Sequence, residues 1–99
     1  MRLTVPTDFE ILRALSDGKR NNAINLAADI DRNRSYINTR LPILADFGLI
    51  DRVGPAPNSG LYVITERGRV VAEHQEAYEN KEVEFEALIE DELADESGT

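Results

Sequence analysis

The pattern of apolar and polar positions predicts a first helix near the N-terminus. Three apolar residues follow one another at intervals of three, which gives a helix over 8–17 one buried stripe: Phe9, Leu12 and Leu15. Thr7 and Glu10 have the spacing of a capping box, so the helix should start beside them. Gly18 is placed to end it in a left-handed conformation that other residues resist.

Two further helices follow, joined by a short polar turn. Asn22 is a candidate cap for a short alanine-rich helix, whose small residues allow it to lie close to its neighbours. Asn33 is a good cap for the next helix, whose apolar stripe again has helical spacing: Ile37, Leu41, Leu44 and Phe47. Pro42 removes one helical hydrogen bond, which predicts a kink with 34–41 straight and 42–46 bent.

A hairpin is expected next. Gly48 is placed to stop the third helix, and two short apolar runs, Leu49–Val53 and Leu61–Ile64, predict a strand and a returning strand. The loop 54–60 between them contains two prolines and is too long for a two-residue turn, so it should project as a wing.

A last helix should follow the hairpin. Thr65 can cap it, and it is expected to run to roughly Leu93, open to interruption near Asn80. The order of elements predicts a mainly α fold with a small β-hairpin, namely a winged helix-turn-helix with a long C-terminal helical extension. We expect a domain over 1–72 and an acidic extension over 73–99 that serves dimerisation and frays at its end.

The charge is unevenly distributed along the chain. A net charge of −8 opposes binding to phosphate, but 1–72 carries ten basic and eight acidic residues, whereas 73–99 carries Lys81 alone against eleven acidic residues. A basic patch survives between Lys19 and Arg40, where five basic residues outnumber two acidic ones. Nine arginines against two lysines in an acid-rich chain predict a halophilic protein. In molar salt the Debye length falls to about 3 Å, so recognition would rest on short-range hydrogen bonds and shape.

Composition argues against several other functions. With no cysteine and one histidine, the sequence offers no thiolate or histidine-cluster metal site, and His74 beside Glu73 and Glu76 is a poor ligand set. The acidic pairs after residue 79 have no pocket that would shift a pKa. We therefore expect no catalytic residue, no cofactor and no metal, and not an enzyme. The absence of a long apolar run or a signal peptide predicts a cytoplasmic protein with no membrane partner.

The polar face of the third helix is the candidate surface for reading DNA. Arg34 and Arg40 are candidates for bidentate contact with guanine and Asn38 with adenine, because a helix fits the major groove and each base pair presents its own donors and acceptors there. Base or backbone contacts are expected from the other polar positions near its start: Arg32, Asn33, Ser35, Tyr36 and Thr39. The alternative is an ordinary solvated helix face, but the turn, the capped helix and the wing together favour DNA.

The wing and the connector before the second helix are weaker candidates. Asn58 and Ser59, with Arg52 at the base of the wing, are placed to touch phosphate or the minor groove, but a merely structural hairpin fits a tip without Lys or Arg equally well. Residues 19–22 are similarly open to phosphate contacts or to simple solvation.

The last helix carries a sparse seven-residue repeat, here called the heptad series: Val71, Tyr78 and Phe85, with Leu88 nearby. Such a repeat predicts pairing with its copy in a homodimer. His74 and Lys81 would weaken that seam, so a helix folding back on its own domain is the rival. We favour the dimer because helix-turn-helix proteins commonly bind two half-sites about one helical turn apart.

Three runs of this sequence resemble haloarchaeal winged-helix regulators of the halophage phi-H repressor type. They are Asn-Arg-Ser-Tyr-Ile-Asn-Thr-Arg-Leu-Pro-Ile-Leu-Ala-Asp-Phe-Gly-Leu-Ile from Asn33, Arg-Val-Gly-Pro-Ala-Pro-Asn-Ser-Gly-Leu-Tyr from Arg52, and Ile-Thr-Glu-Arg-Gly from Ile64. The resemblance covers about residues 6–72 and implies an archaeal DNA-binding transcriptional regulator.

The expected function is therefore sequence-specific binding of double-stranded DNA by a homodimeric regulator. A repressor acting by promoter occlusion is favoured, because no activation surface and no small-molecule effector site is evident. The alternative is a winged-helix protein-interaction module that uses the acidic C-terminal helix.

Overall fold

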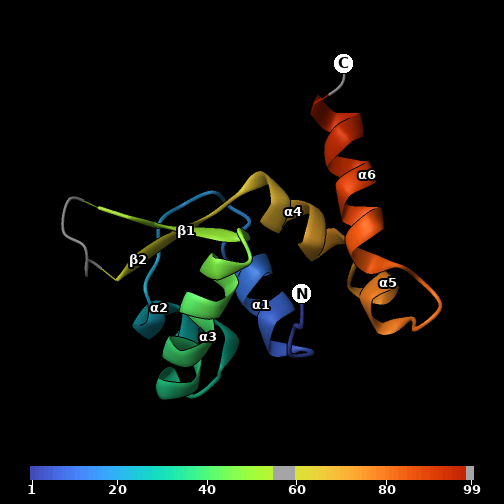
Figure 1. Cartoon of the computed structure of the whole chain (residues 1–99). Coiled ribbons are helices and arrows are strands. Elements are labelled where there is room, and N and C mark those ends of the chain that lie inside the picture. The colour runs from blue at the N-terminus through green and yellow to red at the C-terminus, as the bar shows by residue number, and fades with distance from the viewer. Residues whose placement is uncertain (55–59, 98–99) are drawn as a thin grey trace.

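Six helices and one β-hairpin make up the described part of the chain. The computed structural model describes residues 1–54 and 60–97. The elements run in the order α1 (Thr7–Ala14), α2 (Ala23–Ile30), α3 (Arg34–Asp46), β1 (Ile50–Val53), β2 (Leu61–Ile64), α4 (Glu66–Glu73), α5 (Gln75–Glu79) and α6 (Phe85–Ser97) (Figure 1). The predicted fold class is confirmed: the chain is a mainly helical winged helix with a two-stranded antiparallel hairpin and a helical C-terminal extension. No helix within those residues is long and apolar enough to span a bilayer.

The hairpin pairs Ile50 with Ile64 at its inner end and Val53 with Leu61 at its outer end. An isolated bridge adds Asn21 to the free edge of β2, where the backbones of Asn21 and Tyr62 exchange two hydrogen bonds of 2.9 and 2.8 Å. The hairpin therefore projects to one side of the helices, while α6 stands at the opposite side (Figure 1).

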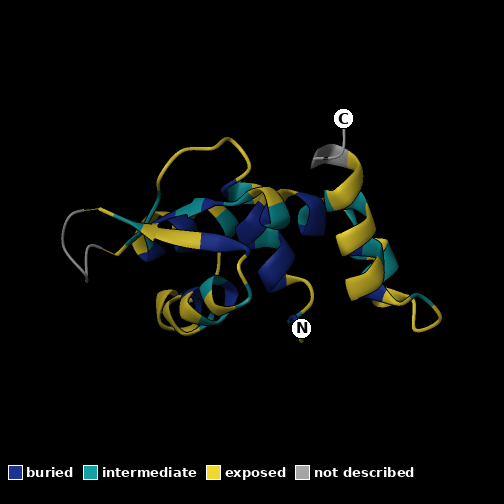
Figure 2. Ribbon diagram, turned by 45° about the horizontal axis from the view of Figure 1, so that its top comes forward, coloured by how far each residue is buried: buried dark blue, intermediate teal, exposed yellow. Residues whose placement is uncertain are grey.

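The core lies where α1, α2, α3, the inner end of the hairpin and α4 meet. The buried residues, dark blue in Figure 2, are concentrated there, and most of them are apolar. Those with no exposed surface come from every one of these elements and from α6, and they include Phe9, Leu12, Leu26, Ile37, Leu44, Ile50, Val71 and Ile89. Such continuous burial is the main stabilising contribution in a domain of this size.

Local side-chain chemistry sets the helix starts as predicted at three places. Asn22 Oδ1 accepts from the backbone N–H of Asn25 at 2.9 Å, and Asn33 Oδ1 from that of Tyr36 at 3.2 Å. Thr65 Oγ1 accepts from the N–H of Gly68 at 3.0 Å. Each cap satisfies a backbone donor that the first helical turn leaves free.

The predicted start and end of the first helix are wrong. Thr7 is buried inside α1, and no side chain caps the helix, so the capping box with Glu10 does not form. The carboxylate of Asp8 instead accepts from the backbone N–H of Thr4 at 2.7 Å. The helix ends at Ala14 and continues as a turn to Gly18, whose φ of 81° is left-handed as expected.

The third helix has the predicted length and is continuous through Pro42. The bend expected at this residue stays a prediction. Gly48, with φ of 78°, ends the segment: its N–H donates to the Ala45 carbonyl and that of Leu49 to the Leu44 carbonyl, the paired bonds of a Schellman motif.

The last helix is broken twice, where the sequence predicted one interruption. The break at residues 80–84 lies where it was expected near Asn80, but a further break at His74 separates α4 from α5. The two breaks let α5 and α6 turn back and pack against the core. The Tyr78 ring lies 5.6 Å from that of Phe9 and 5.0 Å from that of Phe85, and its hydroxyl pairs with the backbone N–H and carbonyl of Leu3. The extension therefore packs on the core of the domain, and the division after residue 72 stays a prediction.

Gly68 allows α4 to lie directly on the start of the hairpin. A Cβ built there would meet the Leu49 carbonyl oxygen at 2.1 Å and Ile64 Cγ1 at 2.8 Å. Gly-to-Ala changes in helices usually stabilise by up to about 1 kcal/mol, whereas overpacking costs about 1–3 kcal/mol or more.

We predict that Gly68→Ala lowers the free energy of unfolding by at least about 2 kcal/mol, because backbone must move to admit the methyl group. Urea denaturation measures the change. Glu73→Ala, an exposed position on the same helix, is the control and should stay within about 0.5 kcal/mol of the parent. A Gly68→Ala protein as stable as the parent would contradict the close contact.

Candidate nucleic-acid interface

One flank of α3 faces the hairpin. Residues four apart lie one above the other on a helix, so Arg34, Asn38 and Pro42 form a single row. Two shallow hollows mark the space beside this row. One, of about 280 Å³, is lined by Asn38, Pro42, Arg52, Gly60 and Tyr62. The other, of about 230 Å³, is lined by Asn22, Ala23, Ile24, Arg34, Asn38 and Gly60. Asn38 lines both hollows and is the centre of this flank.

The polar groups of this row are available to a ligand. Arg34 and Asn38 are exposed, and neither side chain has a hydrogen-bond partner among residues 1–54 and 60–97. Ser35 and Thr39 are exposed next to them on the outermost face, and the Thr39 hydroxyl donates to the Ser35 carbonyl at 3.1 Å. These four exposed residues offer donors and acceptors along the first two turns of α3.

The prediction that Arg40 faces outward is wrong. Its guanidinium lies on the other flank of α3 and binds Asp8 through two bonds, Nε to Oδ1 at 3.0 Å and Nη2 to Oδ2 at 2.8 Å. The Asp8 side chain is fully buried and that of Arg40 is 14% exposed. The hydrogen bond to Asp8 raises the pKa of Arg40 above its ordinary value, against the opposing effect of burial. Arg40 thus holds α3 on α1 and is not free to read a base.

Other candidates near the start of α3 are partly engaged within the chain. Arg32 is exposed but pairs with Glu10 at 2.8 Å, and Asn33 uses its side-chain oxygen as the helix cap. Tyr36 is exposed on the same flank as Arg40, away from the row that faces the hairpin. None of the three lines the hollows beside Arg34 and Asn38.

Arg52 lies near the outer end of the hairpin, at the base of the wing. Its Nη2 donates to the Tyr62 hydroxyl at 2.8 Å, and its guanidinium carbon lies 5.5 Å from the centre of the Tyr62 ring. Both residues line the hollow next to Asn38. The other predicted wing residues, Asn58 and Ser59, lie outside the described residues.

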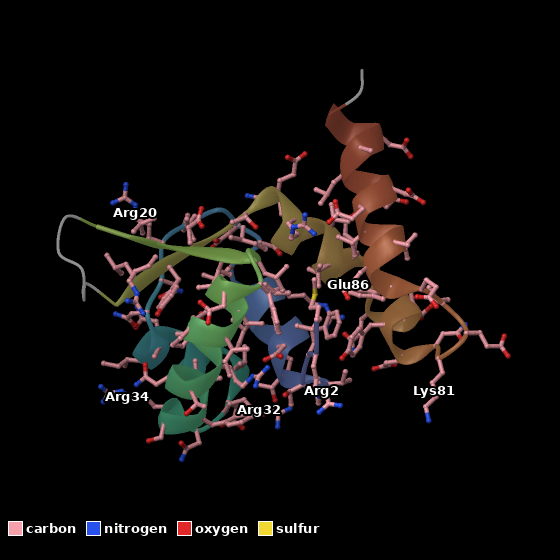
Figure 3. All side chains as sticks on the ribbon, in the orientation of Figure 1. Arg2, Arg20, Arg32, Arg34, Lys81 and Glu86 are labelled. Atoms are coloured by element: carbon pink, nitrogen blue, oxygen red, sulfur yellow. The ribbon has the colours of Figure 1, made fainter. Side chains whose placement is uncertain are left out.

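The α1–α2 connector brings the exposed Arg20 to the hairpin side of the molecule (Figure 3). The bridge between Asn21 and Tyr62 carries this connector to the edge of β2. Figure 3 shows Arg20 and Arg34 at the hairpin side, above and below it, whereas Lys81 lies at the opposite end. Lys19 and Arg20 are exposed. No pattern in the sequence predicts this bridge, because a single pair of residues has no periodicity.

The heptad series packs within its own domain. Val71 is fully buried, Phe85 is nine-tenths buried, and Tyr78 is tied to Leu3. Tyr78 and Leu88 are both half-buried, but Tyr78 packs against the buried core and Leu88 is not among the residues that do so. The predicted seam is therefore wrong for Val71, Tyr78 and Phe85, and the rival interpretation, a chain that folds back, describes them correctly.

Comparison with solved structures supports the winged-helix assignment. No protein-family model and no curated protein sequence matches the chain. A MarR-family protein of Mycobacterium tuberculosis in complex with DNA is similar in structure, with a TM-score of 0.60 and 32% identity over 76% of this chain and 54% of that one. The oxidised form of MarR from Escherichia coli gives 0.57 and 23% identity over 69% and 51%. The present chain spans about half the length of these two proteins.

A viral domain shares the same fold. The Zalpha domain of cyprinid herpesvirus 3 ORF112, whose binding mode to Z-DNA was described, gives a TM-score of 0.55 and 17% identity. The similarity covers 65% of this chain and all of that domain. The winged helix is thus the structure that these proteins share.

We predict that Arg40→Ala lowers the free energy of unfolding by about 3–5 kcal/mol, because it leaves the buried Asp8 carboxylate without its partner. Urea denaturation measures the loss. Arg32→Ala, which breaks the exposed pair with Glu10, is the matched control and should cost less than about 1 kcal/mol. Equal effects of the two substitutions would contradict the structural role of Arg40.

Proposed function

We propose that this protein is a transcriptional regulator that binds double-stranded DNA in a sequence-specific manner. The observation that carries the proposal is the row formed by Arg34 and Asn38, exposed, without partners in the described chain and flanked by the hairpin. The 32% identity to a MarR-family protein in complex with DNA supports it, as does the resemblance to haloarchaeal phi-H-type regulators.

The contacts follow from the chemistry of the row. Inserted into the major groove, Arg34 donates to guanine O6 and N7, and Asn38 pairs with N7 and N6 of adenine. Ser35 and Thr39 reach neighbouring bases or phosphates. Lys19 and Arg20 set the register on the backbone beside the hairpin. Arg40 contributes by fixing the rotation of α3, without touching DNA.

Two exposed acidic side chains, on α3 and on β1, restrict how α3 can approach DNA. Asp46 is exposed on the outer face near the end of α3, and Asp51 is exposed on β1. Both repel phosphate, so the helix enters the groove by its first two turns. Binding that depends on short-range contacts suits a halophilic archaeal protein, because concentrated salt removes most long-range attraction.

We infer that the protein acts as a homodimeric repressor that occludes a promoter. Two copies would read two half-sites about one helical turn apart. The contact between copies cannot use the buried members of the heptad series. The half-buried Leu88 on α6, which stands away from the hairpin (Figure 1), is the member with surface left for a second copy.

A protein-interaction module is the second candidate, favoured by the charge of α6. Between Phe85 and Asp95 this helix carries five acidic residues and no basic one. In this alternative the acidic helix binds a basic partner, and α3 is not the functional surface. Deleting the extension would not separate the two functions, because Phe85 and Ile89 belong to the core.

We predict that Arg34→Ala and Asn38→Ala each weaken binding to the selected DNA site by about 1–3 kcal/mol and relax the base preference at one position. The site would be selected from a random duplex library in concentrated potassium salt, and affinity measured by mobility-shift titration. Arg2→Ala, which removes an exposed arginine away from the hairpin (Figure 3), is the control and should change affinity little.

Two results would count against this function. Failure of the parent protein to enrich any sequence would favour the interaction module. An equal small loss for Arg34→Ala and Arg2→Ala would show that general charge, and not the row on α3, governs binding.

A double variant of α6 tests the interaction module. Asp91→Asn with Asp95→Asn neutralises two exposed acids of α6, and it should leave the base preference unchanged if the protein is a DNA-binding regulator.

We predict that light scattering at micromolar protein and high salt gives a mass twice that of one chain, and that Leu88→Glu returns it towards one chain by placing a charge in the contact. Ala87→Glu, at an exposed neighbour on the same helix, is the control. A parent protein with the mass of a single chain would contradict the homodimer.

A further inference from the structure

An apolar side chain stands on the proposed DNA-binding surface without a role in the core. Ile24 is 54% exposed, the largest exposure among the three large apolar side chains that are exposed in the described chain. Its helix already packs through Ala23, Leu26 and Ala27, which are buried. Single exposed apolar residues are common, so exposure alone assigns nothing, and the position of Ile24 carries the argument.

Ile24 lies beside the row that the proposed function uses to read bases. It lines the same hollow of about 230 Å³ as Arg34 and Asn38, at the first turn of α2. The other two exposed apolar residues do not line this hollow: Val5 precedes α1, and Tyr36 is on the opposite flank of α3. A duplex seated on Arg34 and Asn38 would therefore cover Ile24 as well.

The edges of the bases decide what Ile24 can contact. In the major groove the bases present hydrogen-bonding atoms, which an isoleucine cannot pair, and one apolar group, the C5 methyl of thymine. Covering Ile24 with a polar base edge would leave that edge unpaired, whereas covering it with a methyl group removes apolar surface from water on both sides.

We propose that Ile24 is a specificity-determining residue that recognises the methyl group of a thymine next to the base pairs contacted by Arg34 and Asn38. The inference rests on the proposed function, and it adds a thymine to the site. It also assigns α2 a part in base recognition, beyond the support it gives to α3.

The test compares thymine with deoxyuridine, which lacks only the methyl group. The parent protein and Ile24→Ala are each used for selection from a random duplex library in concentrated potassium salt. The parent should enrich a thymine at one position that Ile24→Ala does not. Replacing that thymine by deoxyuridine should weaken binding of the parent about three- to five-fold, the effect of losing one methyl contact, and should not weaken binding of Ile24→Ala further.

Two control variants make the result specific. Val5→Ala removes an exposed apolar group outside the hollow and should retain both the thymine preference and the full effect of deoxyuridine. Ile24→Val, which keeps a branched apolar side chain, should retain most of the preference. Urea denaturation of Ile24→Ala should match that of the parent, since the side chain is exposed.

The outcomes separate this inference from the proposed function. If the parent selects a site but deoxyuridine has no effect at any thymine in it, or has the same effect on Ile24→Ala as on the parent, methyl recognition by Ile24 is overturned while DNA binding stands. If the parent selects no sequence, the proposed function fails, and the inference fails with it.

Discussion

The buried pair of Asp8 and Arg40 sets the arrangement on which the rest of the structure depends. It joins the first turn of α1 to the second turn of α3 through two hydrogen bonds, and it also holds the backbone of Thr4. An apolar stripe defines which side of a helix faces the core but permits some rotation. A bidentate arginine–carboxylate pair is directional and removes that freedom. Breaking it would leave a charge in the core, so the arrangement resists change.

Because the rotation of α3 is fixed, its polar residues lie on two flanks with different roles. The flank with Arg40 serves the fold, and the flank with Arg34 and Asn38 faces the hairpin and remains open. The bridge between Asn21 and Tyr62 then places the α1–α2 connector beside the hairpin. The first two turns of α3 therefore share the hairpin side of the molecule with residues from three other segments. These are Arg20 of the connector, Arg52 of the hairpin and the apolar Ile24 of α2.

Many features that depend on residues close together in the sequence were predicted correctly. The wrong predictions for Arg40 and for the heptad series concern contacts between residues far apart in the sequence. The caps at Asn22, Asn33 and Thr65 depend on residues three apart, so sequence spacing reveals them. The pairing of Asp8 with Arg40 crosses 32 residues and depends on how two helices rotate against each other, which periodicity does not encode. Likewise a seven-residue repeat shows that a stripe is covered, without showing whether a second copy or the chain's own core covers it.

The placement of α6 at the side away from the hairpin has a consequence for the encounter with DNA. Most of the negative charge follows residue 72, and the basic connector and Arg34 lie at the other side (Figure 3). The molecule is therefore an electric dipole whose positive end is the surface proposed to bind. In dilute salt a polyanion exerts a torque that turns this end forward and disfavours approach by the acidic helix. In dilute salt the acidic extension thus orients a protein whose net charge alone would oppose the approach, and concentrated salt removes this effect.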